Sequence, residues 1–292
     1  MTTTTLERPE VISGRFVENM PEEEYHAHPA LSASGMKVLL RSPKHFRLSR
    51  TENRARTEFD VGHAVHCRVL GIGLPIVEIP FGILASNGAV STKEAKAFVA
   101  DARAEGKVPL KPATFAEVVR ASDAVLSNAK AMSLLERPGF TELSLFTEDP
   151  STGVKLRSRL DRLTADGLLI DLKSTTDVRP RKITNAVVDF GYDLSAAVYR
   201  HVVELVTGEA PSPMHLIFVE KDAPHDVRVV KLADPAWQIG GEVKMRAAID
   251  LFAWCSERGI WPGDDEDGGD IHELPVPAWY ERQNTTPEEG WL

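Results

Sequence analysis

One short stretch of the chain carries the pattern of a β-hairpin that bears two aspartates and a lysine. Apolar and polar residues alternate from Val154 to Thr164 and again from Leu168 to Ser174. This pattern predicts two antiparallel strands joined by a tight turn at Asp166-Gly167. Side chains on a strand point to alternate faces, so Asp171 and Lys173 should share one face. We expect this hairpin at the centre of the sheet.

The length of the turn decides where the first aspartate lies. A loop of residues 165–167, with Gly167 in the left-handed conformation, places Asp161 directly opposite Asp171. Two facing carboxylates destabilise a sheet unless a divalent cation or a shared proton lies between them. A two-residue loop would instead place Asp161 opposite Leu172, on the other face. The prediction of a metal site therefore depends on the longer loop.

The other predicted elements indicate an α/β protein with a mixed central sheet and flanking helices. At 292 residues, the chain is long enough for one large domain. We expect residues 1–20 as a flexible arm, and residues 21–292 as one domain with an acidic C-terminal segment. Periodicity and capping residues predict helices near 32–40, 42–48, 57–70, 92–105, 114–136, 182–189, 193–207 and 235–254, and further strands near 75–80, 141–147, 215–220 and 226–232.

The charge is unevenly distributed along the chain. The net charge of −9 argues against a nucleic-acid partner, but a local basic surface matters more than the total. Such a surface is predicted between residues 37 and 56, whereas the C-terminal part is acidic. The bases are Lys37, Arg41, Lys44, Arg47, Arg50, Arg54 and Arg56. Basic runs also commonly coat solvated helices, so charge alone leaves both interpretations open.

Several functional classes lose support. No apolar run approaches the roughly 20 residues of a membrane helix, and the N-terminus lacks a signal-peptide pattern. Cys67 and Cys255 are the only cysteines, which predicts two reduced thiols in a cytoplasmic protein. The phosphate-binding loop, the dinucleotide fingerprint and the nucleophile elbow are all absent. Nucleotide-hydrolysing motors, Rossmann dehydrogenases and α/β-hydrolases therefore lose support.

The two aspartates suit a hard cation such as Mg²⁺, for which Mn²⁺ can substitute. Lys173 would then orient water or stabilise charge on a phosphate, although a surface hairpin with a salt bridge is the plainer alternative. His63 and His66 share a helix face, which suggests zinc, but no third nitrogen or sulfur ligand is evident. Glu142, at the start of a predicted strand, could reach the same cleft.

Tyr192 and Tyr199 lie seven residues apart on one predicted helix. Aromatic residues at this spacing usually belong to a core, and the alternative is that they stack on a base or pack on Lys173.

Six segments, taken together and in order, resemble the nuclease domain of the RecE-like exonucleases (exodeoxyribonuclease VIII), within the PD-(D/E)xK superfamily. The similarity runs from about Tyr25 to the tail, including PVPAWY near Trp279. The segments are LSASGMKVLLRSPKHFR, FDVGHAVHCRVL, TELSLFTEDPSTG, LRSRLDRL, LIDLKSTTDV and GYDLSAAVYRHVV.

The resemblance implies a Mg²⁺-dependent exonuclease that digests double-stranded DNA from 5′ to 3′. The 3′ single strand it leaves would pass to an annealing protein of the RecT type, and the enzyme would form a homo-oligomeric ring. The implied metal ligands are Asp161, Asp171, Glu142, His66 and the carbonyl of Leu172. The implied catalytic group is Lys173, with Tyr192 and Tyr199 on the following helix. The chain departs from the family pattern in having Ser195 in place of a glutamine and Leu160 in place of a proline.

We expect the DNA phosphates to be held by the basic segment, chiefly Lys37, Arg41, Lys44 and Arg47, together with Arg157 and Arg159. Three alternatives remain open. They are a Mg²⁺-dependent endonuclease of the same superfamily, a non-catalytic protein that binds DNA ends and recruits a recombination partner, and a zinc hydrolase built on His63 and His66. No membrane partner is expected.

Overall fold

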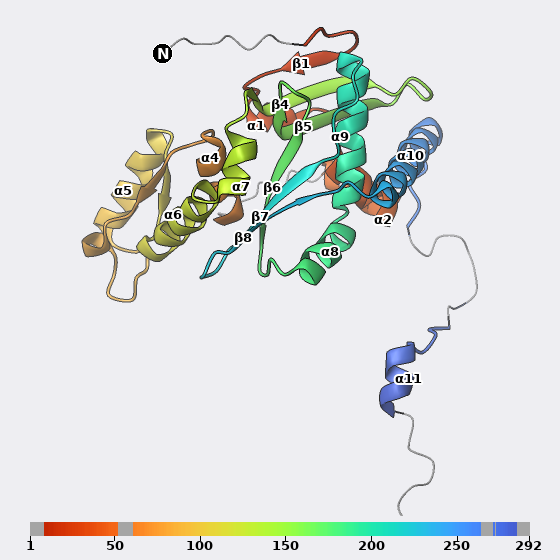
Figure 1. The fold of residues 1–292 in the computed structure, drawn as a ribbon. Coiled ribbons are helices and arrows are strands. Elements are labelled where there is room, and N and C mark those ends of the chain that lie inside the picture. The colour runs from red at the N-terminus through yellow and green to blue at the C-terminus, as the bar shows by residue number, and fades with distance from the viewer. Residues whose placement is uncertain (1–8, 52–60, 264–270, 272, 285–292) are drawn as a thin grey trace, which may run out of the picture.

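A six-stranded mixed sheet forms the centre of the protein (Figure 1). The structure is a computed structural model and describes residues 9–51, 61–263, 271 and 273–284. The strands lie in the order β1-β4-β5-β6-β7-β8, so the predicted hairpin is central. Their bounds are β1 Arg15–Val17, β4 Gly139–Glu148, β5 Lys155–Thr164, β6 Leu169–Thr175, β7 His215–Glu220 and β8 Val227–Lys231.

The strand pairings make the sheet mixed, as the sequence predicted. Only β6 and β7 are parallel, and the four other neighbouring pairs are antiparallel. A connection through helices separates β6 from β7, as a parallel pair requires. A small two-stranded parallel sheet, β2 (Ile76–Glu78) with β3 (Val108–Leu110), lies apart from the main one. The fold is therefore α/β with flanking helices.

The loop between β5 and β6 has the predicted length. The backbone N–H of Thr164 donates to the carbonyl of Leu168 at 3.0 Å. Gly167 has a φ of 78°, in the left-handed region that glycine adopts without a steric cost. Pairing continues with Leu163 opposite Leu169. The three-residue loop therefore sets the register on which the predicted metal site depends.

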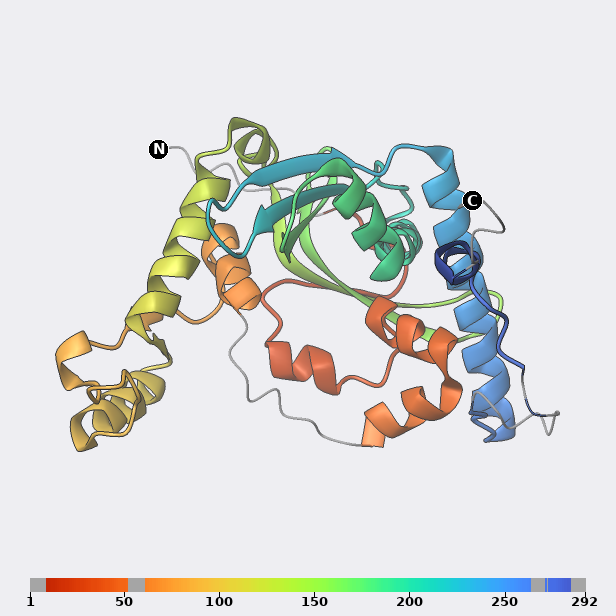
Figure 2. The same cartoon turned by 90° about the horizontal axis from the view of Figure 1, so that it is seen from below.

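Helices cover both faces of the sheet (Figures 1 and 2). On one face, α9 and α10 pack over a core that contains Leu216 and Phe218. On the other face, α4 and α6 pack over Leu172 and Ile217. The helices are α1 Glu22–Ala27, α2 Ala33–Arg41, α3 Pro43–Thr51, α4 Val61–Leu70, α5 Lys93–Ala104, α6 Pro112–Leu126, α7 Ala129–Leu135, α8 Pro180–Asp189, α9 Tyr192–Thr207, α10 Pro235–Arg258 and α11 Ala278–Asn284, with a 3₁₀ turn at Phe81–Ile83.

Two regions differ from the sequence expectation. The predicted helix over residues 114–136 is two helices, because the side chain of Asn128 caps the second by accepting from the N–H groups of Lys130 and Ala131. Within the expected flexible arm, Arg15–Val17 pair with β4 as β1, and the side chains of Phe16 and Met20 are buried. Residues 1–8 and 57–60 lie outside the described residues. Among the helices of the described residues, none is both long and apolar enough to cross a membrane.

Candidate active site

At Asp161, a side-chain hydrogen bond replaces a backbone hydrogen bond of the ladder between β5 and β6. The ladder pairs Arg162 with Ile170, and the same register places Asp161 opposite Asp171. Here the Asp161 carboxylate, rather than a backbone carbonyl, accepts the hydrogen bond of the Leu172 N–H at 2.8 Å. The carboxylate is thus held between the two strands of the hairpin.

Glu142 occupies a strained position on the neighbouring strand. Its φ is 49°, and it falls between the pairs Thr141–Arg162 and Leu143–Leu160 of the β4–β5 ladder. A left-handed backbone at a residue other than glycine costs about 1–3 kcal/mol, and such strain is concentrated at functional sites. The Glu142 carboxylate lies 3.5 Å from Nδ1 of His66. Its other oxygen accepts a hydrogen bond from Nε of Arg159.

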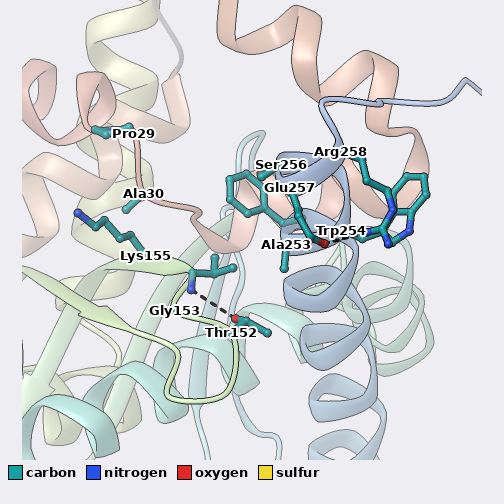
Figure 3. A pocket seen from close by; sticks show the side chains of 12 residues that line it. Pro29, Ala30, Thr152, Gly153, Lys155, Ala253, Trp254, Ser256, Glu257 and Arg258 are labelled. Atoms are coloured by element: carbon teal, nitrogen blue, oxygen red, sulfur yellow. Dashed lines mark hydrogen bonds and ion pairs between the residues drawn. The ribbon is translucent and has the colours of Figure 1, made fainter.

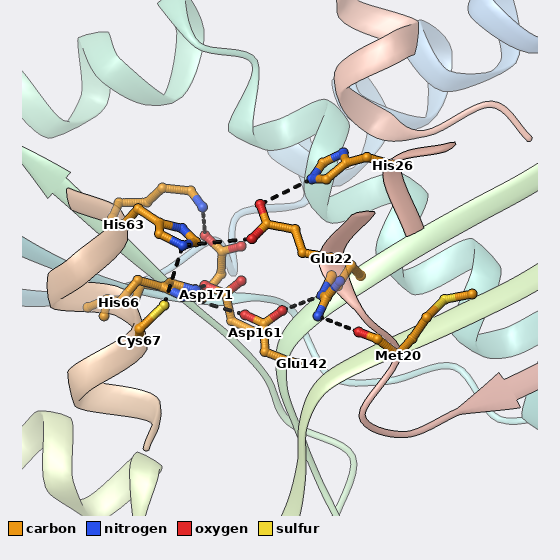
Figure 4. A network of polar contacts seen from close by, with 12 residues as sticks. Met20, Glu22, His26, His63, His66, Cys67, Glu142, Asp161 and Asp171 are labelled. Atoms are coloured by element: carbon orange, nitrogen blue, oxygen red, sulfur yellow. Dashed lines mark hydrogen bonds and ion pairs between the residues drawn. The ribbon is translucent and has the colours of Figure 1, made fainter. Parts of the chain in front are cut away.

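His66 meets these two carboxylates from the helix layer that covers this face of the sheet (Figure 4). It projects from α4, and its Nε2 lies 2.9 Å from Oδ2 of Asp161. One ligand atom each from His66, Glu142 and Asp161 lie within 4.8 Å of one another. Two carboxylates and an imidazole at this spacing fit a divalent cation. Three of the five predicted metal ligands therefore meet in one cluster.

The charges of this cluster depend on one another. Burial by itself would lower the pKa of His66, but Asp161, Cys67 and Glu142 together outweigh burial and raise it to about 11. Burial would raise the pKa of Asp161, but the positive charges of His66 and Lys173 lower it. His66 is therefore an imidazolium here, and its nitrogen must lose a proton before it can bind a metal directly.

Asp171 and Lys173 form a second, adjoining pair. Asp171 is 2% exposed and forms an ion pair with Nζ of Lys173. Burial, followed by the charge of Asp161, raises the pKa of Asp171. Burial would lower the pKa of Lys173, but the two aspartates raise it. Lys173 is thus a protonated donor beside the cluster of His66, Glu142 and Asp161, and Asp171 lies next to that cluster rather than within it.

Lys37 reaches the same place from α2. Its Nζ lies 5.4 Å from the centre of the Tyr192 ring, and Nζ of Lys173 lies 5.5 Å from it. Burial and the charge of Lys173 lower the pKa of Lys37 to about 8. Tyr199, a predicted neighbour of Tyr192, packs against the core. Tyr192 packs against this core too, and its ring contacts both lysines. Burial, followed by the charges of Asp171 and Asp161, raises the pKa of Tyr199, so its hydroxyl also lies close to the acids.

The remaining basic candidates divide into two groups. Arg41, Lys44 and Arg47 are exposed on α2 and α3, where DNA could reach them. Arg157 is 4% exposed and donates to the carbonyl of Tyr25, so the expectation that it holds a DNA phosphate is wrong. Arg159 donates to Glu142 and to the carbonyl of Met20, and it supports the carboxylate instead.

The hydroxyl of Ser195 is directed back to its own helix. It lies 3.4 Å from the carbonyl of Gly191, and the residue is buried. Ser195 therefore makes no contact with the acidic cluster.

His63 and His66 face different carboxylates, although both contact the thiol of Cys67. Nε2 of His63 lies 3.5 Å from Sγ of Cys67 and 3.8 Å from a carboxylate oxygen of Glu22, whereas His66 faces Asp161. The sequence did not single out Glu22 as a neighbour of these residues. The four-residue spacing of His63 and Cys67 on one helix was the available signal for their contact.

A hollow of about 680 Å³ lies away from this network (Figure 3). It is bounded by the C-terminal half of α10 and the turn between β4 and β5, with Val154, Phe252 and Trp254 in its walls. The one carboxylate of its lining, Glu257, forms an ion pair with Arg258 at 2.9 Å. This hollow offers no cluster of metal ligands, so the chemistry is assigned to the sheet.

Comparison with known proteins agrees with this fold. Residues 32–268 match the family described as "PDDEXK-like domain of unknown function (DUF3799)". The crystal structure named "Putative exonuclease" from Eubacterium rectale superposes with a TM-score of 0.57 at 15% identity, covering 89% of this chain and 97% of that one. A second structure, SSO0001, has a TM-score of 0.30 at 11% identity, covering 66% of this chain and 84% of that one. No curated protein matches the chain.

Proposed function

Because this chain belongs to the family of PDDEXK-like domains of unknown function (DUF3799), we propose that it is a divalent-cation-dependent nuclease that acts on double-stranded DNA. One observation carries the proposal. The hairpin register, the strained backbone of Glu142 and the α4 helix bring His66, Glu142 and Asp161 together beside the Asp171–Lys173 pair. A nuclease of this superfamily needs such a group of acids with one amine.

The donor set suits Mg²⁺, with Mn²⁺ as a substitute. Asp161 and Glu142 would hold the cation through hard carboxylate oxygens, and Asp171 adjoins them. Such a cation supplies Lewis-acid stabilisation of the charge that develops on a phosphodiester. His66 forms an ion pair with Asp161, so we place it at the edge of the site rather than as a firm ligand. We retain the Leu172 carbonyl as a proposed further ligand.

The chain's own residues then have distinct tasks. Protonated Lys173 donates hydrogen bonds to the attacking water or to the phosphate and stabilises negative charge there. Lys37 lies over the same Tyr192 ring as Lys173 and can hold a neighbouring phosphate. Arg159 orients the carboxylate of Glu142. The raised pKa of Lys173 favours its role as a donor over that of a base.

We propose an exonuclease that digests from the 5′ end and leaves 3′ single strands for a RecT-type annealing protein. The sequence resemblance to RecE-like enzymes supports this proposal, and we propose with it the ring-like oligomer that the resemblance implies. Arg41, Lys44 and Arg47 would hold phosphates near the duplex end without reading sequence.

The decisive experiment incubates the protein and Mg²⁺ with linear or covalently closed circular duplex DNA, with label at either strand end. Loss of label from 5′ ends of linear DNA alone supports the proposal. Cutting of circles would identify an endonuclease, and binding without cleavage would identify an end-binding protein. Asp161→Asn serves as the inactive control, and Asp101→Asn, an exposed change on α5, as the matched active control. Activity that survives in Asp161→Asn would remove this cluster from the chemistry.

A further inference from the structure

A second group of side chains, of the types that ligate metal ions, lies at the rim of the acidic cluster (Figure 4). His63 and Cys67 project from α4, and Glu22 begins α1. Nε2 of His63 lies 3.5 Å from Sγ of Cys67 and 3.8 Å from Oε2 of Glu22. The other oxygen of Glu22 lies 3.5 Å from Nε2 of His26. We call Glu22, His63 and Cys67 the rim cluster.

The spacing of His63 and Cys67 matches that of two ligands in a tetrahedral zinc site, whereas Glu22 lies farther from the sulfur. Zinc lies about 2.3 Å from a thiolate sulfur and about 2.0–2.1 Å from an imidazole nitrogen, so the two ligand atoms stand about 3.5 Å apart. The His63 nitrogen and the Cys67 sulfur are 3.5 Å apart. A carboxylate oxygen would stand about 3.4 Å from the nitrogen, compared with 3.8 Å for Glu22 here. To bind zinc, the exposed side chain of Glu22 would therefore have to move closer to the sulfur as well as to the nitrogen.

We propose that the rim cluster is a zinc site, distinct from the hard-cation cluster of His66, Glu142 and Asp161. Sulfur and imidazole ligands favour Zn²⁺ over Mg²⁺, whereas paired carboxylates favour Mg²⁺. Thus the two groups select different ions although they lie side by side. His26 contacts the outer oxygen of Glu22 and orients the ligating carboxylate, as outer partners of zinc ligands do. Water completes the coordination.

Zinc in this cluster would act on the neighbouring site. It would join α1 to α4 and place two positive charges one residue along the helix from His66. This charge disfavours a second cation at Glu142 and Asp161, so zinc should inhibit cleavage that depends on Mg²⁺. This consequence rests on the proposed nuclease function, whereas zinc binding itself does not.

Binding can be tested without any activity, using Co²⁺ as a spectroscopic substitute for Zn²⁺. The full-length protein should show a thiolate-to-cobalt charge-transfer band, which Zn²⁺ then abolishes by displacement. Cys67→Ser should remove the band, and Cys255→Ser, at the buried cysteine of α10, should retain it. His63→Gln and Glu22→Gln should weaken cobalt binding about tenfold or more. Circular dichroism verifies that each variant is folded.

Three outcomes would overturn the proposal: no band in the wild-type protein, a band that survives Cys67→Ser, or a band that Cys255→Ser removes. Should Cys67→Ser fail to fold, the exposed side chains of His63 and Glu22 carry the same test. Cobalt at the carboxylate cluster gives no thiolate band, so the two sites cannot be confused.

The inhibitory role has its own test. Zinc titrated into a Mg²⁺-dependent cleavage assay should inhibit the wild type at a concentration about tenfold or more below that needed for Cys67→Ser. Equal sensitivity of the two proteins would overturn inhibition through the rim cluster. If neither protein cleaves DNA, the proposed function fails while the cobalt measurement still decides the zinc site.

Discussion

The carboxylate of Asp161 accepts a hydrogen bond from the backbone N–H of Leu172, on the neighbouring strand, at 2.8 Å. A side chain thereby takes the place of a backbone acceptor between the two central strands. Because Leu172 stands between Asp171 and Lys173, the strand that fixes Asp161 also carries the other acid and the amine. The hairpin therefore fixes Asp161, Asp171 and Lys173 relative to one another, whereas the other residues of the site come from α4, β4, α2 and α9.

Lys173→Ala should abolish cleavage while leaving DNA binding nearly intact. The amine stabilises charge that develops during the reaction, and loss of such a donor costs on the order of 10²–10³-fold in rate. Initial rates of nucleotide release, with affinity measured in Ca²⁺, separate the two effects. Lys155→Ala, on the exposed end of β5, is the matched control and should cleave normally. A Lys173→Ala protein with wild-type rates would refute the assigned role.

The affinity for DNA should fall steeply with salt, because cations of the protein release counterions from the phosphates. Removal of two phosphate contacts by Arg41→Ala with Lys44→Ala should reduce the slope of log K against log salt by about 1.8. Fluorescence anisotropy with a labelled duplex measures this slope. Lys93→Ala with Lys96→Ala makes the same charge change on α5. If the α5 pair reduced the slope equally, DNA binding could not be assigned to α2 and α3.

Asp149 should stabilise the fold in a pH-dependent way. It is 1% exposed, and its carboxylate accepts hydrogen bonds from both terminal nitrogens of Arg246 and from Thr152. Burial alone would raise the pKa of Asp149, but these partners lower it from 3.8 to about 2. Because the folded-state pKa is depressed, the stabilisation is present above about pH 4 and is lost as the pH falls through about 2.

Asp149→Asn should therefore lower the free energy of unfolding at pH 7 by about 2 kcal/mol. It should also flatten the decline in stability between pH 4 and 2, as measured by urea unfolding. Asp250→Asn removes the other, exposed carboxylate that contacts Arg246 and should change stability little. A variant as stable as the wild type at pH 7 would contradict this account.

Two adjacent glycines in α10 should respond oppositely to alanine. A Cβ at Gly241 would lie 2.4 Å from the carbonyl oxygen of Asp193, which is impossible without separating α10 from α9. A Cβ at Gly240 would meet its nearest atom at 3.8 Å, an ordinary contact. We expect Gly241→Ala to destabilise by roughly 1–3 kcal/mol. Gly240→Ala should stabilise by up to about 1 kcal/mol through helix propensity. Thermal unfolding of the pair measures the difference, and equal responses would contradict the close packing.

Sequence patterns predicted much of this protein because they rest on local physics. Alternation and an Asp-Gly turn determine a hairpin, and the number of loop residues then determines which side chains face each other. The facing positions of Asp161 and Asp171 follow from chain geometry over a few residues. The capped and periodic segments around the hairpin likewise indicated an α/β fold. Periodicity alone predicted one helix over residues 114–136, which the cap at Asn128 divides into α6 and α7.

Only the tertiary structure decided which distant side chains meet this hairpin. The docking of α4 brings His66 to Asp161 and places His63 beside Glu22 of α1. Burial of Arg157 removes it from any DNA surface, although its charge and position in the sequence matched those of a phosphate ligand. The physical reason is that helix docking and burial depend on the packing of whole layers, which no short run of residues encodes.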